Sequence, residues 1–351
     1  MTEETISMKT IFKEHPGIGL KLGEQPVPRP KDNEVLIRVH AVGICGTDVH
    51  IYDWDDWSSG RIKPPLVAGH EFVGEVVERG AMVLTVEIGQ RVSAEGHITC
   101  GHCEFCRTGQ GHICRDVEII GVDRDGCFAE YICIDAGNLW PVPDSIPDHV
   151  AALYDPVGNA MHTVMAEPVT GKSVLISGAG AIGLFAVAIA SSAGAASIIV
   201  SEPNEFKRTQ ALKAGADCAL SPADLDYEKD VLDLTDGLGP QILLEMSGHP
   251  DGIRSGLRLL RNGGVACVLG IPSKPITLDW AHDVVFKGIT VRAINGRRMF
   301  DTWYQTQNFL LREQKSIEHL ITHILPFDEF ERGFDLLHSG EAIKVVLEIS
   351  R

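Results

Sequence analysis

The sequence has no cluster of basic residues, and acidic residues exceed basic ones. Its 351 residues include 31 Lys and Arg against 48 Asp and Glu, which gives a formal net charge of −17 at pH 7. A surface that binds nucleic acid needs clustered Lys and Arg to neutralise phosphates. The composition therefore argues against a nucleic-acid partner, and the acidity favours a soluble protein.

The N-terminus has no apolar run and carries two acidic residues, whereas a secretory signal has basic residues followed by an apolar segment. We therefore expect a cytoplasmic protein. One stretch without charge, Ser173 to Ser201, is long enough to cross a bilayer. Glycines and serines interrupt it, and short strand-like runs open and close it, so we expect no membrane span.

A regular cysteine framework is also missing, because four of the nine cysteines lie between Cys100 and Cys114 and the others are scattered. This uneven spacing favours reduced thiols that bind metal over a disulfide scaffold. The four clustered cysteines form the pattern C-x2-C-x2-C-x7-C, and they are Cys100, Cys103, Cys106 and Cys114. Four thiolates can close a tetrahedral shell around a structural zinc ion. An iron–sulfur cluster is the main alternative, but bacterial runs of that type carry proline after the last cysteine, where this chain has Arg115.

A second set of metal-ligand types lies nearer the N-terminus, where Cys45 is followed by Thr47, His50 and, further on, His70 and Glu71. A thiolate, an imidazole and a carboxylate are ligands that a catalytic zinc takes while it keeps one position open. The hydroxyl and the second imidazole lie close enough in sequence to form one end of a proton path. Taken singly, each of these residues is more often structural than functional.

The chain is longer than a single core usually supports, so we expect two domains. Alternating apolar and polar residues at 34–42 predict a half-buried strand, and further short strands predict a small antiparallel barrel-like module with little helix. From residue 173 the pattern changes to alternating strands and helices, which predicts a parallel sheet. The expected strands are 173–177, 197–201, 242–246, 265–270 and 289–294, and the expected helices are 181–193, 204–214 and 252–260.

Three less regular segments complete this interpretation. Residues 151–167 have helical composition, interrupted by Asp155-Pro156, and 299–311 predict a further helix. A final alternating run at 344–349 predicts that the chain returns to the first domain.

A glycine pattern, Gly178-x-Gly180-x-x-Gly183, directly follows the strand at 173–177 and opens the next helix. This is the setting of a dinucleotide-binding turn, in which the glycines permit a tight turn, a close approach of the backbone to a pyrophosphate and close helix packing. Glu202 directly follows the next strand, 197–201, and a carboxylate there would bind adenosine ribose hydroxyls and repel a 2′-phosphate. NAD is therefore favoured over NADP, although Lys207 keeps NADP open as an alternative.

With these motifs in order, the chain resembles the zinc-dependent medium-chain alcohol dehydrogenases over essentially its whole length. Several segments are similar to the branch of that family that acts on L-threonine, namely 45–57, 61–65, 69–71, 95–103, 158–163 and 298–303. The resemblance implies an α/β protein with a GroES-like β-barrel catalytic domain, residues 1–157 and 300–351. It also implies a Rossmann domain with a doubly wound parallel sheet, residues 158–299, and a cytoplasmic homotetramer.

The resemblance also implies site roles. Cys45, His70 and Glu71 match the catalytic-zinc motif and the four clustered cysteines the structural zinc, so two zinc ions per subunit are expected. Thr47 and His50 match a proton relay, and Asp155 stands where the wider family usually has a Glu that supports the zinc site and proton transfer. The positions that match NAD contacts, in addition to the glycine turn, are Ile182, Glu202, Lys207, Leu269, Gly270, Ile271, Ala293 and Ile294.

The implied reaction is oxidation of the 3-hydroxyl of L-threonine by NAD to 2-amino-3-oxobutanoate, through a zinc-bound alkoxide and the Thr47 and His50 relay. Two alternatives stay open: a zinc-dependent polyol or amino-alcohol dehydrogenase, and a non-catalytic NAD-binding protein. Two features have no single interpretation at this point. The segment Tyr52–Trp57 either shapes the mouth of the substrate site or packs at a contact between subunits. His97 either reaches the substrate or supports the metal sites.

Overall fold

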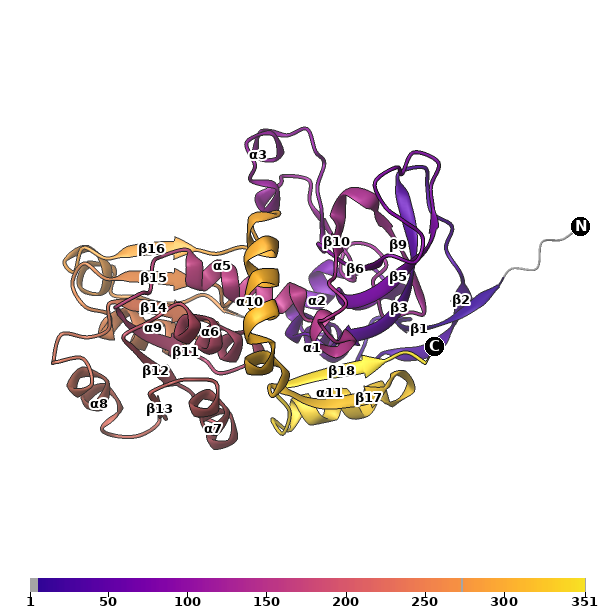
Figure 1. Cartoon of the computed structure of the whole chain (residues 1–351). Coiled ribbons are helices and arrows are strands. Elements are labelled where there is room, and N and C mark those ends of the chain that lie inside the picture. Colours follow the sequence, from indigo (N-terminus) through magenta and orange to yellow (C-terminus); the bar gives the residue numbers. More distant parts are fainter. Residues whose placement is uncertain (1–5, 273, 351) are drawn as a thin grey trace, which may run out of the picture. The chain divides into compact units, whose positions relative to one another are not determined.

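The computed structural model describes residues 6–272 and 274–350, which form two compact units (Figure 1). Unit 1 contains the described residues up to 156, residues 298–314 and those from 321 onward, and unit 2 contains residues 157–297 and 315–320. None of the described helices has the length and apolar character that a bilayer crossing requires.

The described part of unit 1 contains two larger β-sheets and a two-stranded sheet formed by β7 (His97–Ile98) and β8 (Glu118–Ile119). Of the two larger sheets, the smaller has the order β2-β1-β4, and the larger has the order β10-β6-β5-β3-β18-β17, with β9 also paired to β3. The strands are β1 (Ser7–Lys13), β2 (Lys21–Pro26), β3 (Glu34–Gly43), β4 (Leu66–Val67), β5 (Glu71–Arg79), β6 (Arg91–Ala94), β9 (Tyr131–Asp135), β10 (Leu139–Pro141), β17 (Ile321–Pro326) and β18 (Lys344–Glu348). β18 pairs with β3, so the C-terminal run lies in the larger sheet of unit 1.

Strand β3 lies at the centre of the larger sheet, between β5, β9 and β18. The sequence predicts a half-buried strand here, and this is wrong, because every residue of β3 except Arg38 is buried. Helix α4 (Asp148–Ala151) packs on β3, so both faces of the strand are covered. The polar residue His40 is therefore buried, whereas Arg38 keeps a side chain that is 40% exposed and pairs with Glu75.

Helices are more frequent in unit 1 than the sequence predicts. Cys45 and Asp55 precede two short helices, α1 (Gly46–Asp53) and α2 (Asp56–Arg61), in a module expected to contain little helix. Near 155, where unit 1 passes into unit 2, the predicted interruption is misplaced. Pro156 lies in the first turn of α5 (Tyr154–Met165), most of which belongs to unit 2, and proline is tolerated there because its missing N–H has no helical partner. The other short elements are β7 (His97–Ile98), α3 (Glu104–Arg107), η1 (Gly111–Ile113), β8 (Glu118–Ile119), η2 (Ala136–Asn138), η4 (Phe327–Glu329) and α11 (Phe330–His338), and α10 (Asp301–Glu318) is longer than predicted.

Unit 2 contains a six-stranded parallel sheet in the order β13-β12-β11-β14-β15-β16, which confirms the predicted parallel sheet (Figure 1). The chain moves from β11 toward one edge and then returns to β14 and moves toward the other edge. Since parallel crossovers are right-handed, the connecting helices cover opposite faces. The elements are β11 (Ser173–Ser177), α6 (Ala181–Ser192), β12 (Ser197–Ser201), α7 (Glu205–Lys213), β13 (Cys218–Leu220), α8 (Tyr227–Asp233), β14 (Ile242–Glu245), α9 (Pro250–Leu259), β15 (Val265–Val268), η3 (Ala281–Val285) and β16 (Thr290–Ala293).

Candidate active site

Three predicted ligands meet in unit 1, because their potential ligand atoms, from Cys45, His70 and Glu71, all lie within 4.8 Å of one another. Cys45 stands between β3 and α1, and Glu71 begins β5. The antiparallel pairing of β3 with β5 places Gly43 opposite Glu71. The strand register therefore brings together two motifs that are distant in sequence.

Asp48, which the sequence did not single out, ties the two motifs together. Its side chain is fully buried and accepts hydrogen bonds from the backbone N–H of Cys45 (2.9 Å) and of Gly69 (3.2 Å). Burial raises the pKa of the Asp48 carboxyl, while the charge of His70 and the Cys45 N–H oppose that rise. One carboxyl group thus positions the backbone at Cys45 and the backbone directly before His70.

Lys344 is a second residue that the sequence did not single out. It begins β18, and its ammonium forms an ion pair with the carboxylate of Glu71 and donates a hydrogen bond to the carbonyl of Ile44 (2.7 Å). Burial opposes the charge of Lys344, but Glu71 and Cys45 outweigh it and raise the pKa of Lys344 above its ordinary value. A buried cation therefore faces the ligand cluster.

The donor atoms of the cluster fit a zinc ion. Among the described residues, His70 Nδ1 and Glu71 Oε1 are buried without a hydrogen-bond partner. Buried polar atoms are rarely left unpaired, and an imidazole, a carboxylate and a thiolate are zinc ligands. Burial would lower the pKa of His70, but the adjacent Cys45 and Asp48 raise it to about 10. The cluster is thus electrostatically suited to a cation.

Asp155 lies beside this cluster without belonging to it. It is in the first turn of α5 and 4% exposed, and its charge contributes to the raised pKa of His70. Among the described residues, the ligand atoms that lie close together at this site come from Cys45, His70 and Glu71, and the group does not include Asp155. The structure therefore places Asp155 close to the predicted metal ligands but not among them.

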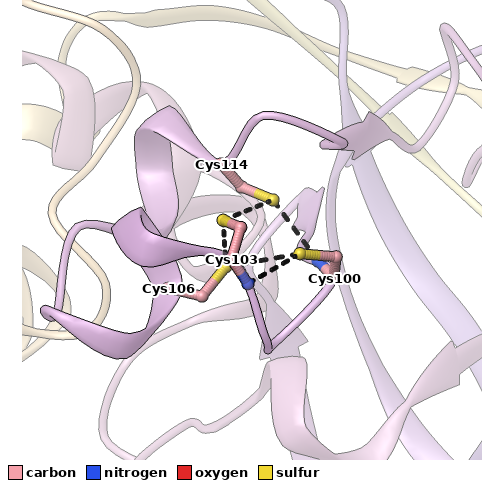
Figure 2. A group of neighbouring side chains, drawn as sticks. All are labelled: Cys100, Cys103, Cys106 and Cys114. Carbon is pink, nitrogen blue, oxygen red and sulfur yellow. Dashed lines mark hydrogen bonds between the residues drawn. The ribbon is translucent and has the colours of Figure 1, made fainter.

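The four clustered cysteines converge in one loop of unit 1 (Figure 2). The sulfur of Cys103 lies 3.5 Å from that of Cys106 and 3.8 Å from that of Cys114, and the sulfurs of Cys100 and Cys106 lie 4.0 Å apart. These distances exclude disulfides, and they match the S···S edge of about 3.8 Å that a zinc tetrahedron with Zn–S bonds of about 2.3 Å requires. Backbone N–H groups of Cys106 and Arg115 lower the pKa of Cys103 to about 6, which favours the thiolate.

Thr47 and His50 lie one turn apart on α1, the helix that follows Cys45. This i,i+3 spacing puts them on the same face, with Thr47 half-buried and His50 exposed. His50 Nδ1 lies 2.7 Å from a carboxylate oxygen of Asp55, a residue that the sequence did not single out for a role of its own.

The aromatic residues of Tyr52–Trp57 have partners within unit 1. Tyr52 stacks on Phe334 with ring centroids 4.5 Å apart, and the ammonium of Lys13 lies 5.2 Å from the ring of Trp54. Trp57 meets the ring of His50 edge-on. These contacts favour packing within the unit as the role of Tyr52 and Trp54.

His97 belongs to a buried network. The fully buried carboxylate of Glu95 lies 2.7 Å from His97 Nδ1 and accepts a hydrogen bond from the indole N–H of Trp303 (2.8 Å). The ring of His97 is therefore held in one orientation.

Unit 2 contains a cavity of about 1110 Å³, which is lined in part by Gly178, Gly180, Glu202 and Lys207. A Cβ atom added at Gly180 would meet no atom within 4 Å, so the space over this glycine is free for a ligand. The carboxylate of Glu202 is fixed, since it accepts hydrogen bonds from the N–H groups of Ala179 (2.8 Å) and Asn204 (3.0 Å). The predicted turn and the predicted acid thus share one cavity.

The remaining predicted cofactor contacts lie near the carboxyl edge of the same sheet. Ile182 and Gly183 are in the first turn of α6, the segment 269–271 follows β15, Ala293 ends β16 and Ile294 follows it. Of the described residues, those that line the cavity do not include any of these positions. The lining does include Arg254 and Arg258, which the sequence did not single out and which form ion pairs with Asp251 and Glu228.

Comparison with known proteins gives matches to both units. The model of the alcohol dehydrogenase GroES-like domain matches residues 31–144, and that of the zinc-binding dehydrogenases matches residues 181–312. The L-threonine 3-dehydrogenase of Bacillus licheniformis is 47% identical over 343 residues, covering 97% of this chain and 99% of that protein. The enzyme of the same name from Pyrococcus horikoshii is 46% identical over 340 residues, covering 97% and 98%.

Solved structures agree with this result. An alcohol dehydrogenase of Escherichia coli in complex with NADH has a TM-score of 0.89 at 26% identity, covering 97% of this chain and 99% of that chain. The predicted fold class, a GroES-like barrel combined with a Rossmann sheet, is confirmed. The chain belongs to the zinc-dependent medium-chain alcohol dehydrogenases, and its relatives in that family include L-threonine 3-dehydrogenases.

Proposed function

We propose that the chain oxidises the 3-hydroxyl of L-threonine to 2-amino-3-oxobutanoate with NAD. The observation that carries this proposal is the buried cluster of Cys45, His70 and Glu71, in a chain 47% identical to an L-threonine 3-dehydrogenase over nearly its full length. The polyol and amino-alcohol alternatives share the metal chemistry, and similarity over the full length favours L-threonine over them.

Cys45, His70 and Glu71 bind a zinc ion, and Asp48 and Lys344 hold these ligands in place through the contacts described above. When bound, zinc supplies a Lewis acid that lowers the pKa of a substrate hydroxyl, and NAD supplies the hydride acceptor. Asp155 adds negative charge beside the ligands.

Thr47 and His50 move the substrate proton to solvent. The hydroxyl of Thr47 can accept and donate a proton at one atom, and His50, one helical turn further on, is exposed to water. General acid–base groups of this kind contribute about 10²–10⁴-fold to turnover.

The cavity of unit 2 holds the adenosine and pyrophosphate parts of NAD. The N-terminus of α6 and the free space over Gly180 suit a pyrophosphate, and Glu202 suits ribose hydroxyls and repels a 2′-phosphate. Ile182, Lys207, the segment 269–271 and Ala293 with Ile294 complete the cofactor site.

The four-cysteine loop holds a structural zinc, so each subunit carries two zinc ions. The S···S distances and the favoured thiolate of Cys103 support this assignment. The family resemblance further implies a cytoplasmic homotetramer.

The test is NADH formation from L-threonine, measured against D-threonine, L-serine and sorbitol, with and without a chelator. We expect NADH from L-threonine and its loss after chelation. Faster oxidation of sorbitol would replace the threonine assignment with a polyol dehydrogenase. No NADH from any substrate, together with one zinc per chain, would indicate a non-catalytic NAD-binding protein.

A further inference from the structure

His50 is in contact with one charged group. Its Nδ1 lies 2.7 Å from Asp55 Oδ2, and among the described residues Asp55 is the only charged side chain in contact with the ring. Asp53, on the same helix as His50, is instead paired with His338 of α11 at 2.9 Å. The pair of His50 and Asp55 therefore links the last turn of α1 to the start of α2.

The carboxylate of Asp55 is held rigidly by the helix that it caps. Its Oδ1 accepts a hydrogen bond from the backbone N–H of Ser58 (2.9 Å), and the hydroxyl of Ser58 donates to the carbonyl of Asp55 (3.1 Å). Ser58 is fully buried, so this capping turn is anchored in unit 1. Asp55 thus uses one oxygen for the helix and presents the other to His50.

The charge state of this pair fixes the tautomer of the imidazole. Partial burial opposes the charge of Asp55, but the Ser58 N–H and His50 together lower the pKa of its carboxyl. An ionised carboxylate only accepts hydrogen bonds, so His50 Nδ1 must carry the proton. Nε2 is then the nitrogen that is free to take up another proton, and Trp57 meets the ring edge-on with centroids 6.1 Å apart.

We propose that Asp55 is a positioning residue of the proton relay, which holds His50 with Nδ1 protonated so that Nε2 accepts the proton that leaves the substrate. The proposal rests on the proposed function, in which His50 is the last protein group of the relay. It gives the segment Tyr52–Trp57 a functional role in addition to packing: Asp55 sets the tautomer and Trp57 confines the ring.

Asp55→Asn tests this directly. The amide oxygen can still accept the Ser58 N–H, because Asn is as good an N-cap as Asp, so α2 should persist. The amide N–H₂ then faces Nδ1 and selects the opposite tautomer, in which Nε2 carries the proton. We expect kcat/KM for L-threonine to fall about tenfold or more, within the range of general acid–base effects. Without the anion the imidazolium is less stable, so the acid-side loss of turnover should move to lower pH.

Asp55→Ser separates capping from charge in a second way, since Ser also caps helices but is too short to reach His50. It should lower kcat/KM in the same direction as Asp55→Asn but by less, because no amide then selects the opposite tautomer, and the unfolding temperature should stay unchanged. Asp53→Asn is the matched control, because it removes the same charge two residues away and breaks a pair with His338 instead. It should keep the pH profile of the unmodified protein.

Different outcomes contradict the proton relay of His50 and the positioning role of Asp55. If His50→Asn lowers turnover while Asp55→Asn and Asp55→Ser keep the original rate and pH profile, the positioning role of Asp55 is overturned. It is also overturned if Asp55→Asn lowers turnover equally in the original protein and in the His50→Asn variant, or if Asp53→Asn has the same effect. Unchanged turnover in His50→Asn would instead remove His50 from the relay and contradict that part of the proposed function.

Discussion

The ion pair between Lys344 and Glu71 makes a strong prediction about stability. The side chains are 2% and 0% exposed, so Lys344→Met leaves a buried carboxylate without its counter-ion. Removing one partner of a buried pair costs about 3–5 kcal/mol. For a unit of about 200 residues, 1 kcal/mol shifts the unfolding temperature by about 2–4 °C, so the variant should unfold about 6–20 °C lower. A zinc ion bound to Glu71 would neutralise part of the carboxylate charge. The fall in unfolding temperature would then lie near the lower end of this range.

The assay is calorimetric unfolding of Lys344→Met in two backgrounds, the original chain and Glu71→Gln. In the second background the same change no longer removes the partner of the Glu71 anion and leaves only the carbonyl of Ile44 without its hydrogen bond, so it should cost clearly less than in the original chain. The difference between backgrounds measures the pair itself, because any zinc lost with Glu71→Gln is absent from both members of that comparison.

Lys13 provides the control, because it is a buried lysine for which the described part of the chain shows no ion pair. It is 1% exposed and donates hydrogen bonds to the carbonyls of Gly17 and Gly19 (both 2.6 Å). Lys13→Met should lower the free energy of unfolding by about 1–3 kcal/mol, because it leaves these carbonyls unpaired, and the loss should be the same in both backgrounds. An equal cost of Lys344→Met in the two backgrounds would refute the reasoning, since the lysine would then act by packing and not as the counter-ion of Glu71.

Three further predictions concern other parts of the chain. Gly180→Val should raise the Kd for NAD more than about tenfold in a fluorescence titration, because the valine side chain fills space that the protein leaves free. The unfolding temperature of this variant should stay within about 2 °C of the original value. His40 and Arg91 lower the pKa of Asp148 below 3.8 against the effect of burial, so this carboxylate stabilises the fold above about pH 4 and loses that effect as the pH falls further. The stability advantage over Asp148→Asn, about 2 kcal/mol at pH 7, should shrink below pH 4 in denaturant titrations. Cys103→Ser should lower the zinc content from about two to about one per chain and lower the unfolding temperature, because a structural zinc site contributes directly to folding; metal analysis that still gives about two zinc ions would contradict the four-cysteine site.

The sequence predicts those parts of the molecule whose signals are local. The turn from Gly178 to Gly183, the strands around it and the spacing of the four cysteines each lie within one short segment, and the structure places them as expected. Cys45 and His70 could be predicted for a different reason, because each belongs to a short motif of recognisable ligand types.

The roles of Lys344 and Asp48 could not be predicted from the sequence, because they come from tertiary contacts. The partner of Lys344 in the ion pair is Glu71, far away in the sequence, and its only local signal is a basic residue at the start of an apolar strand. Asp48 looks like an ordinary acidic residue in the first turn of a helix, and only the fold brings Gly69 to its second oxygen. The half-buried pattern of β3 was misleading for the same reason, since burial by α4 does not depend on local alternation.

The register of three strands explains why these residues meet. Gly43 at the end of β3 lies opposite Glu71 of β5 and opposite Val346 of β18, so the first and last thirds of the chain converge at one backbone position. A Cβ atom at Gly43 would collide with the carboxylate of Glu71 and come within 3.1 Å of Lys344 Cε. The buried ion pair therefore requires a residue without a side chain between its two partners. Because β18 supplies the lysine and β5 the carboxylate, the charge balance of the ligand cluster depends on the pairing of the C-terminal strand with the larger sheet.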